Sequence, residues 1–216
     1  MSADASRNDV AQQPPRADLD LTGFPDGGQP DAAMFRAHLA AFGPWFFASH
    51  PRGRFNLEDP NGTCYFADDI ETAVREFYGP KIRRNELSAK DAEVLRVSRV
   101  LPPEDATYAH VSGSGAARFG VTSELATMGD YEVTRAWAEV FNERVNGLRY
   151  NSRFNPGSES WALFGIAGAA PSLGVDPSGS VDGAAAVKAA GVTVLPEPPM
   201  KRSVRMVPPP SAAPVD

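Results

Sequence analysis

Short apolar runs alternate along this chain with segments of helical periodicity. Residues 63–67, TCYFA, form an apolar and aromatic run that is typical of a buried strand. Asp68 and Asp69 follow this run, and aspartate is a good helix N-cap. The next segment, IETAVREFY, has apolar residues at helical spacing and ends at Gly79–Pro80, a helix stop. We therefore expect a buried strand that leads directly into a capped helix.

Similar patterns predict further helices and strands. The helices are a short one capped by Asn85 or Ser88 and ending at Glu93, a long one from the Asp130 cap to about Asn146, and a weak one over 180–190. The strands are expected within VLRVSRVLPP, LRY, WALFGI and VTVLP. Helices mixed with strands indicate an α/β or α+β domain over about residues 31–195.

The two ends of the chain are expected to lie outside this domain. Residues 1–30 are polar and rich in Pro, Asp, Gln and Gly, so they have too little apolar surface to offset the entropy lost on ordering. From Pro196 onward the sequence is Pro-rich and carries a short basic island. We predict a disordered arm over residues 1–30 and a disordered tail over residues 196–216.

Composition limits the location and the partners of the protein. The 216 residues carry a formal net charge of −6, which disfavours nucleic-acid binding because phosphate backbones require a clustered positive surface. No apolar run has the length of a signal-peptide core or of a membrane span. The single cysteine, Cys64, cannot form an internal disulfide, and the histidines show no close metal-ligand spacing. We expect a cytoplasmic protein without a metal site, with neither nucleic acid nor a membrane as its partner.

Arginines near the start of the predicted domain are the first candidates for ligand binding. Arg36 lies in MFRAH and Arg54 in PRGRFN, with Arg52 in the same loop as a weaker candidate. Two guanidinium groups in one cleft would suit a pyrophosphate, because each binds phosphate oxygens through paired hydrogen bonds. The alternative is a pair of surface arginines in solvated ion pairs, and the residues alone favour this alternative.

Tyr65 and Glu76 are the next candidates, on the predicted strand and on the helix after it. Glu76 lies at the flank of the apolar face of that helix, where a carboxylate can be half buried. Such a carboxylate could stabilise a developing cation or hold a sugar hydroxyl, but it could equally be a polar-rim residue beside Arg75. Cys64 neighbours Tyr65 on the strand, so the two side chains should face opposite sides, with Cys64 in the core.

Ser152 is a further candidate, in the segment YNSR at a predicted strand end. Loops at strand ends often carry site residues, but serine is also an ordinary turn former. The residues alone favour a turn.

Taken together, MFRAH, PWFFASHPRGRFNLEDPNGTCYFADDIETAVREFYG and LRYNSRFNPGSESWALFG resemble the RES domain, a family named for an Arg, a Glu and a Ser. The resemblance covers about residues 33–166, and the motifs occur in the family's order. It implies a mixed α+β fold similar to ADP-ribosyltransferases, with a split central sheet flanked by helices. It also implies a toxin of a bacterial toxin–antitoxin pair that consumes NAD⁺ as its substrate. Cleavage would be hydrolysis, or phosphorolysis with phosphate as co-substrate, and would need no cofactor.

The resemblance further implies roles for single residues. Arg36 and Arg54 match two family arginines and would hold the pyrophosphate of NAD⁺. Tyr65 would stack on nicotinamide, and Glu76 would stabilise the positive charge that develops on the ribose. Ser152 would hydrogen-bond the bound dinucleotide. Glu76, Arg36 and Tyr65 would thus be the catalytic group.

Some expectations stay open at this point. A RES protein could instead transfer ADP-ribose to a protein, or could be an inactive module that only binds a partner. As a toxin, it would need an antitoxin protein that covers the cleft. In addition, MFRAHLAAF is helical by its local pattern, whereas the family places its first Arg on a strand, so the two expectations for Arg36 conflict.

Overall fold

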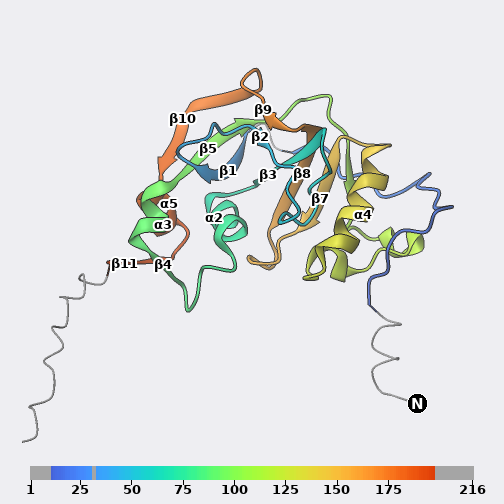
Figure 1. The fold of residues 1–216 in the computed structure, drawn as a ribbon, viewed down its shortest axis with the longest axis horizontal. Helices are drawn as coiled ribbons and strands as arrows, with labels where there is room; N and C mark the ends of the chain where they lie inside the picture. The colour runs from blue at the N-terminus through green and yellow to red at the C-terminus, as the bar shows by residue number, and fades with distance from the viewer. Residues whose placement is uncertain (1–10, 31–32, 198–216) are drawn as a thin grey trace, which may run out of the picture.

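A seven-stranded sheet in the order β10-β5-β1-β3-β8-β7-β6 forms the centre of the computed structural model, which describes residues 11–30 and 33–197 (Figure 1). Its strands are β1 (Met34–Leu39), β3 (Asn61–Ala67), β5 (Leu95–Leu101), β6 (Tyr108–His110), β7 (Gly147–Asn151), β8 (Glu159–Ile166) and β10 (Gly174–Asp182). Neighbouring strands are antiparallel except β6 and β7, which are parallel. The sheet is therefore mixed.

The sheet is split between β1 and β3. β1 pairs with β5 from Met34↔Val100 to Leu39↔Leu95, and β3 pairs with β8 along its whole length. By contrast, β1 and β3 share the single registered pair Phe35↔Ala67. Beyond this pair the two halves of the sheet diverge. The α+β fold with a split central sheet that the resemblance implied is confirmed.

Separate groups of helices cover the two halves on the same face of the sheet. On the β1–β5 half, α2 (Ile70–Tyr78), α3 (Ala89–Val94) and α5 (Gly183–Ala189) share an apolar cluster with these strands. On the other half, α4 (Tyr131–Asn142) packs on β7, and the 3₁₀ helices η1 (Ala116–Phe119) and η2 (Ser123–Ala126) join the same cluster. Figure 1 shows α2 and α4 standing apart along the sheet.

The opposite face of the sheet is covered by irregular chain and by a small sheet of β2 (Phe46–Phe47) and β9 (Gly168–Ala169). Cys64 is fully buried on this face, whereas Tyr65 packs against the cluster on the helical face. The expected opposite orientation of these two neighbours is confirmed. A second small sheet pairs β4 (Glu86–Ser88) with β11 (Thr193–Leu195) in parallel.

Residues 11–30, predicted as part of a disordered arm, instead pack against the α4 half. The side chain of Gln12 is 3% exposed and bonds the backbone of Gly120 and Thr122, while Trp137 Nε1 donates to the carbonyl of Gln13. Leu21 is buried in the same cluster as Trp137. A few well-placed side chains thus order a segment whose average composition is polar. Residues 1–10 of the predicted arm and residues 198–216 of the predicted tail lie outside the described residues.

The predicted helix caps are present, but one helix end and two strands differ from the prediction. The Asp69 carboxylate accepts from the amide of Thr72 at the start of α2, and Ser88 caps α3. Asp130 caps α4, but this helix ends at Asn142 rather than near residue 146. Arg36 lies on a strand, so the local helical pattern was wrong; the ladder with β5 overrides the local helix propensity of MFRAHL. β10 was not predicted at all, because its Gly, Pro and Asp residues are poor strand formers.

Within the described residues, no helix is long and apolar enough to cross a membrane. The same residues contain no group of three or more His, Cys, Asp and Glu that could hold a metal ion.

Candidate active site

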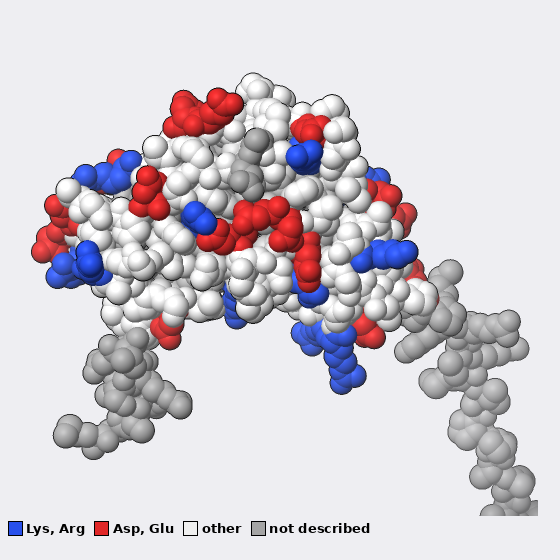
Figure 2. All heavy atoms as spheres, turned by 180° about the vertical axis from the view of Figure 1, so that it is seen from behind, with Lys and Arg blue, Asp and Glu red and all other residues white. Residues whose placement is uncertain are grey.

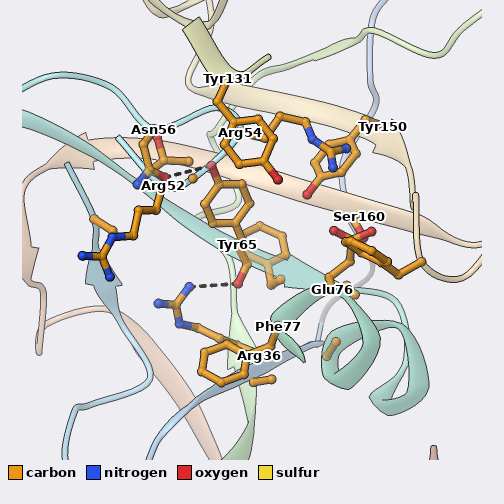
Figure 3. Close-up of a pocket in the computed structure, with 18 of the residues that line it drawn as sticks. Arg36, Arg52, Arg54, Asn56, Tyr65, Glu76, Phe77, Tyr131, Tyr150 and Ser160 are labelled. Atoms are coloured by element: carbon orange, nitrogen blue, oxygen red, sulfur yellow. Dashed lines mark hydrogen bonds between the residues drawn. The ribbon is translucent and has the colours of Figure 1, made fainter. Parts of the chain in front are cut away.

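A cavity of about 340 Å³ lies at the split of the sheet, between α2 and the loop that precedes β3. Four of the five predicted site residues line it: Arg36, Arg54, Tyr65 and Glu76. Figure 3 shows them converging on the cavity from β1, the loop, β3 and α2. Ser152, the fifth, is not among the lining residues and bonds Glu76 from outside the cavity.

The GRFN segment, Gly53 to Asn56, builds one wall of the cavity. Gly53 packs so closely on Asn56 that a Cβ atom would lie 2.1 Å from its Oδ1, so a larger residue at this position would displace the Asn56 amide. Phe55 is fully buried in the core with its ring edge on Tyr150. Asn56, 1% exposed, donates from Nδ2 to the carbonyl of His50 and closes the loop. The loop is therefore held rigidly on both sides of Arg54.

Arg54 is a buried cation whose donors are not all used. Its side chain lines the cavity although the residue is only 7% exposed, and the guanidinium carbon lies 5.8 Å from the ring centroid of Tyr131. Among the described residues, Nε and Nη1 are buried and have no hydrogen-bond partner. A buried guanidinium with open donors is costly unless an anion fills the site. The open donors of Arg54 thus make the cavity suited to an anion.

Tyr65 forms the floor of the cavity and is fixed at its hydroxyl. This hydroxyl donates to Asn56 Oδ1 at 2.8 Å and accepts from the amide of Phe55 at 2.9 Å. Burial raises the pKa of Tyr65, and the nearby Glu76 carboxylate raises it further, so the phenol stays neutral. With the hydroxyl held in the wall, the ring is what Tyr65 offers to a ligand (Figure 3).

Glu76, in the last turns of α2, is half buried and oriented by its partners. Ser152 Oγ donates to Glu76 Oε1 at 2.6 Å, and the amide of Arg153 donates to the same oxygen at 2.9 Å. Ser152 Oγ in turn accepts from the amide of Asn155, so its proton is directed at the carboxylate. Both bonds engage Oε1, and no hydrogen bond from the part of the chain that the structure describes engages Oε2. This arrangement differs from the direct dinucleotide contact that the resemblance implied for Ser152.

Arg36 bridges the two halves of the split sheet. Continuing the antiparallel register past Phe35↔Ala67 would pair β1 with Tyr65, but the strands have already separated there. Arg36 Nη1 donates to the carbonyl of Tyr65 and Nη2 to the carbonyl of Phe46, each at 2.9 Å. The guanidinium thus satisfies a strand carbonyl at the divergence. Its Nε is buried and has no partner among the described residues.

Several lining residues were not predicted as site residues. They come from segments far apart in the sequence and are His50, Asn56, Phe77, Tyr131, Tyr150, Phe154 and Ser160. Tyr150 is buried at 2% exposure, and burial and the Glu76 carboxylate raise its pKa. The segment YNSR pointed to this region, but nothing in the local sequence singled out Tyr131, which α4 brings over Arg54.

The charges of the cavity are unequal. Arg36, Arg52 and Arg54 line it together with one carboxylate among the described residues, that of Glu76, in a chain with a net charge of −6. Seen from behind the view of Figure 1, acidic side chains gather across the middle of the molecule (Figure 2). A cationic cavity in an acidic protein suits an anionic ligand.

Comparison with known families decides the relationship of this chain. The sequence model of the RES domain matches residues 32–182, more than two thirds of the chain. The chain belongs to the RES domain family. No curated protein matches its sequence significantly. The RES domain also has a solved structural relative, a chain of the M. tuberculosis MbcT–MbcA toxin–antitoxin complex. The two share a TM-score of 0.54 and 17% identity, over 74% of this chain and 89% of that one. At this level of sequence identity, the likeness shows a shared fold alone.

Proposed function

We propose that this RES domain cleaves the nicotinamide–ribose bond of NAD⁺. One observation carries the proposal: the half-buried carboxylate of Glu76, with one oxygen held by Ser152, lines the same cavity as the buried guanidinium of Arg54. Nε and Nη1 of this guanidinium have no partner within residues 11–30 and 33–197. The first group suits a developing cation, and the second suits a phosphate. NAD⁺ contains both groups: a ribose that becomes positively charged on cleavage, and a pyrophosphate.

Each group would contribute through its position. Breaking the bond to nicotinamide builds positive charge on the ribose, and Glu76 Oε2 would stabilise that charge without having to reorient, because Oε1 is already fixed. The open donors of Arg54 would bind phosphate oxygens and fix the ribose against Glu76. The ring of Tyr65 would pack on the nicotinamide, and Arg36 would hold β1 and β3 in position at the split through its two backbone bonds.

The acceptor of the ribosyl group is water or phosphate in this proposal. The purified protein is expected to consume NAD⁺ and release nicotinamide. Product analysis with and without phosphate then separates the two: ADP-ribose in both buffers indicates hydrolysis, and ADP-ribose 1″-phosphate formed in phosphate indicates phosphorolysis. Labelled ADP-ribose attached to a protein would indicate transferase activity instead. Binding of NAD⁺ without any turnover would point to an inactive binding module.

We also propose that the protein acts as a toxin with a cognate antitoxin protein. The support is membership of the RES domain family and the fold shared with a chain of a toxin–antitoxin complex. Uncontrolled loss of NAD⁺ would harm a cell, so an inhibitor should cover the cavity. Expression of the wild-type chain alone should stop bacterial growth, whereas a Glu76→Gln chain at the same level should not. Equal growth with both chains would contradict the toxin role.

A further inference from the structure

Arg52 lies in the same rigid loop as Arg54 but differs from it in exposure and in bonding. It is exposed, it lines the cavity, and its side chain makes no hydrogen bond or ion pair with any residue that the structure describes. Its backbone is held, because its amide donates to His50 Nδ1 at 3.2 Å and Asn56 ties the carbonyl of His50. An uncommitted cation is thus presented at the cavity from a fixed backbone.

Arg52 and Glu76 line the cavity from different elements, the loop before β3 and α2 respectively. Figure 3 shows Arg52 on one side of the Tyr65 ring, and Glu76 with Tyr150 and Ser160 on the other side. The Arg54 guanidinium lies toward Tyr150, and its charge acts on the Tyr150 hydroxyl. In this view Arg54 lies on the Glu76 side of the Tyr65 ring, and Arg52 lies on the other side.

Arg36 is less suited than Arg52 to grip a second phosphate. Two of its three nitrogens already bond the carbonyls of Tyr65 and Phe46, so gripping a phosphate would break hydrogen bonds that Arg36 already makes. Arg52 would give up only hydration. Phosphate binding needs donors that are not already in use. On the side of the cavity away from Glu76, phosphate binding therefore depends on Arg52.

From these positions we infer that Arg52 binds the second phosphate of the ligand, the one more distant from the ribose next to Glu76. This inference rests on the proposed function for the identity of the ligand, and it deepens it: the cavity selects pyrophosphate-bearing dinucleotides over mononucleotides. Arg54 serves the first phosphate, which both kinds of ligand carry. Arg52 serves only ligands that carry two.

The test pairs two ligands with matched arginine variants. Calorimetry measures the affinity of wild-type, Arg52→Ala, Arg52→Lys and Arg118→Ala proteins for ADP-ribose, which needs no turnover. Arg118 is exposed on η1 and outside the cavity, so it controls for the loss of one surface charge. We expect Arg52→Ala to bind ADP-ribose about tenfold more weakly, Arg52→Lys to recover part of this loss, and Arg118→Ala to match wild type.

Kinetics then separate the two phosphates. Arg52→Ala should lower kcat/KM for NAD⁺ about tenfold while leaving kcat/KM for nicotinamide mononucleotide within twofold of wild type. ADP-ribose affinity unchanged in Arg52→Ala, an equal loss with both nucleotides, or no binding of ADP-ribose to the wild type would each overturn the assignment. Wild-type protein that binds ADP-ribose through Arg52 but leaves NAD⁺ intact would contradict the proposed activity and keep the phosphate site.

Discussion

The hydroxyl of Ser152 donates a 2.6 Å hydrogen bond to Glu76 Oε1, so the serine orients the carboxylate from outside the cavity. Ser152→Ala removes a charge-assisted bond, which contributes about 1.5–3 kcal/mol. We expect kcat for NAD⁺ to fall about ten- to a hundredfold while KM changes less than threefold. Steady-state kinetics checks this split. Ser158→Ala is the matched control, because Ser158 lies in the same loop and bonds Asn155 instead of Glu76. A rise in KM with kcat preserved would instead favour direct contact between Ser152 and the dinucleotide.

Arg54 should contribute more to the binding of NAD⁺ than to the free energy of unfolding. Its guanidinium is buried with open donors, so Arg54→Met, which keeps the length of the side chain, should leave the free energy of unfolding unchanged or raise it by about 1–3 kcal/mol. The same variant should lose NAD⁺ turnover. Denaturant unfolding and NAD⁺ assays on one preparation test both parts. Arg118→Met, at an exposed position, should change neither; marked destabilisation by Arg54→Met would show that Arg54 is a structural residue.

Tyr65 links the floor of the cavity to the GRFN loop through its hydroxyl. Tyr65→Phe leaves Asn56 Oδ1 and the Phe55 amide without this partner, at a cost of about 1–3 kcal/mol in stability. We expect turnover to fall together with stability, because the loop that carries Arg54 loosens. Tyr78→Phe serves as the comparison: it removes one bond, to the carbonyl of Asp91, away from the cavity. Tyr78→Phe should lower the unfolding midpoint and keep turnover, and a similar loss of turnover in both variants would argue against the link.

His38 makes stability depend on pH in the mildly acidic range. It is 7% exposed, and burial lowers its pKa below the ordinary value of 6.5, so the folded protein favours the neutral ring. The unfolded chain binds the proton more readily, so stability is present above about pH 6.5 and is lost as pH falls through the folded pKa. Unfolding midpoints measured from pH 7.5 to 5 should fall more steeply for wild type than for His38→Asn. Parallel slopes in the two proteins would rule this account out. His110, whose pKa burial also lowers, contributes the same trend to both proteins.

Local sequence predicted the elements that local physics determines. The apolar run at 63–67, the Asp69 cap and the Gly79–Pro80 stop placed β3 and α2 almost to the residue, and with them Tyr65 and Glu76. The strand at Arg36 could not be found in this way, since its pairing partner, Ser98 in β5, is far away in the sequence. The family resemblance supplied that strand because it carries the record of the tertiary fold.

The candidate site was only partly predictable for the same reason. Tyr131 and Tyr150 are ordinary residues of a helix start and a strand, and only the packing of α4 and β7 brings them to Arg54 and Glu76. The partner of the Ser152 hydroxyl is likewise a tertiary contact, across 76 positions of sequence. Residues 11–30 were misjudged because composition averages over the segment, whereas Gln12 and Leu21 are individually well placed.

The central claim is that the Glu76 carboxylate supports cleavage of NAD⁺, and two isosteric variants on the same helix test it most directly. Glu76→Gln keeps an oxygen for Ser152 but removes the charge, while Glu71→Gln removes a charge that pairs with Arg75 outside the cavity. The measurement is the rate of nicotinamide release from NAD⁺ by wild type and both variants, each shown to be folded. We predict at least about a hundredfold loss for Glu76→Gln and near wild-type rates for Glu71→Gln. Equal rates in all three proteins, or no release by wild type, would contradict the claim.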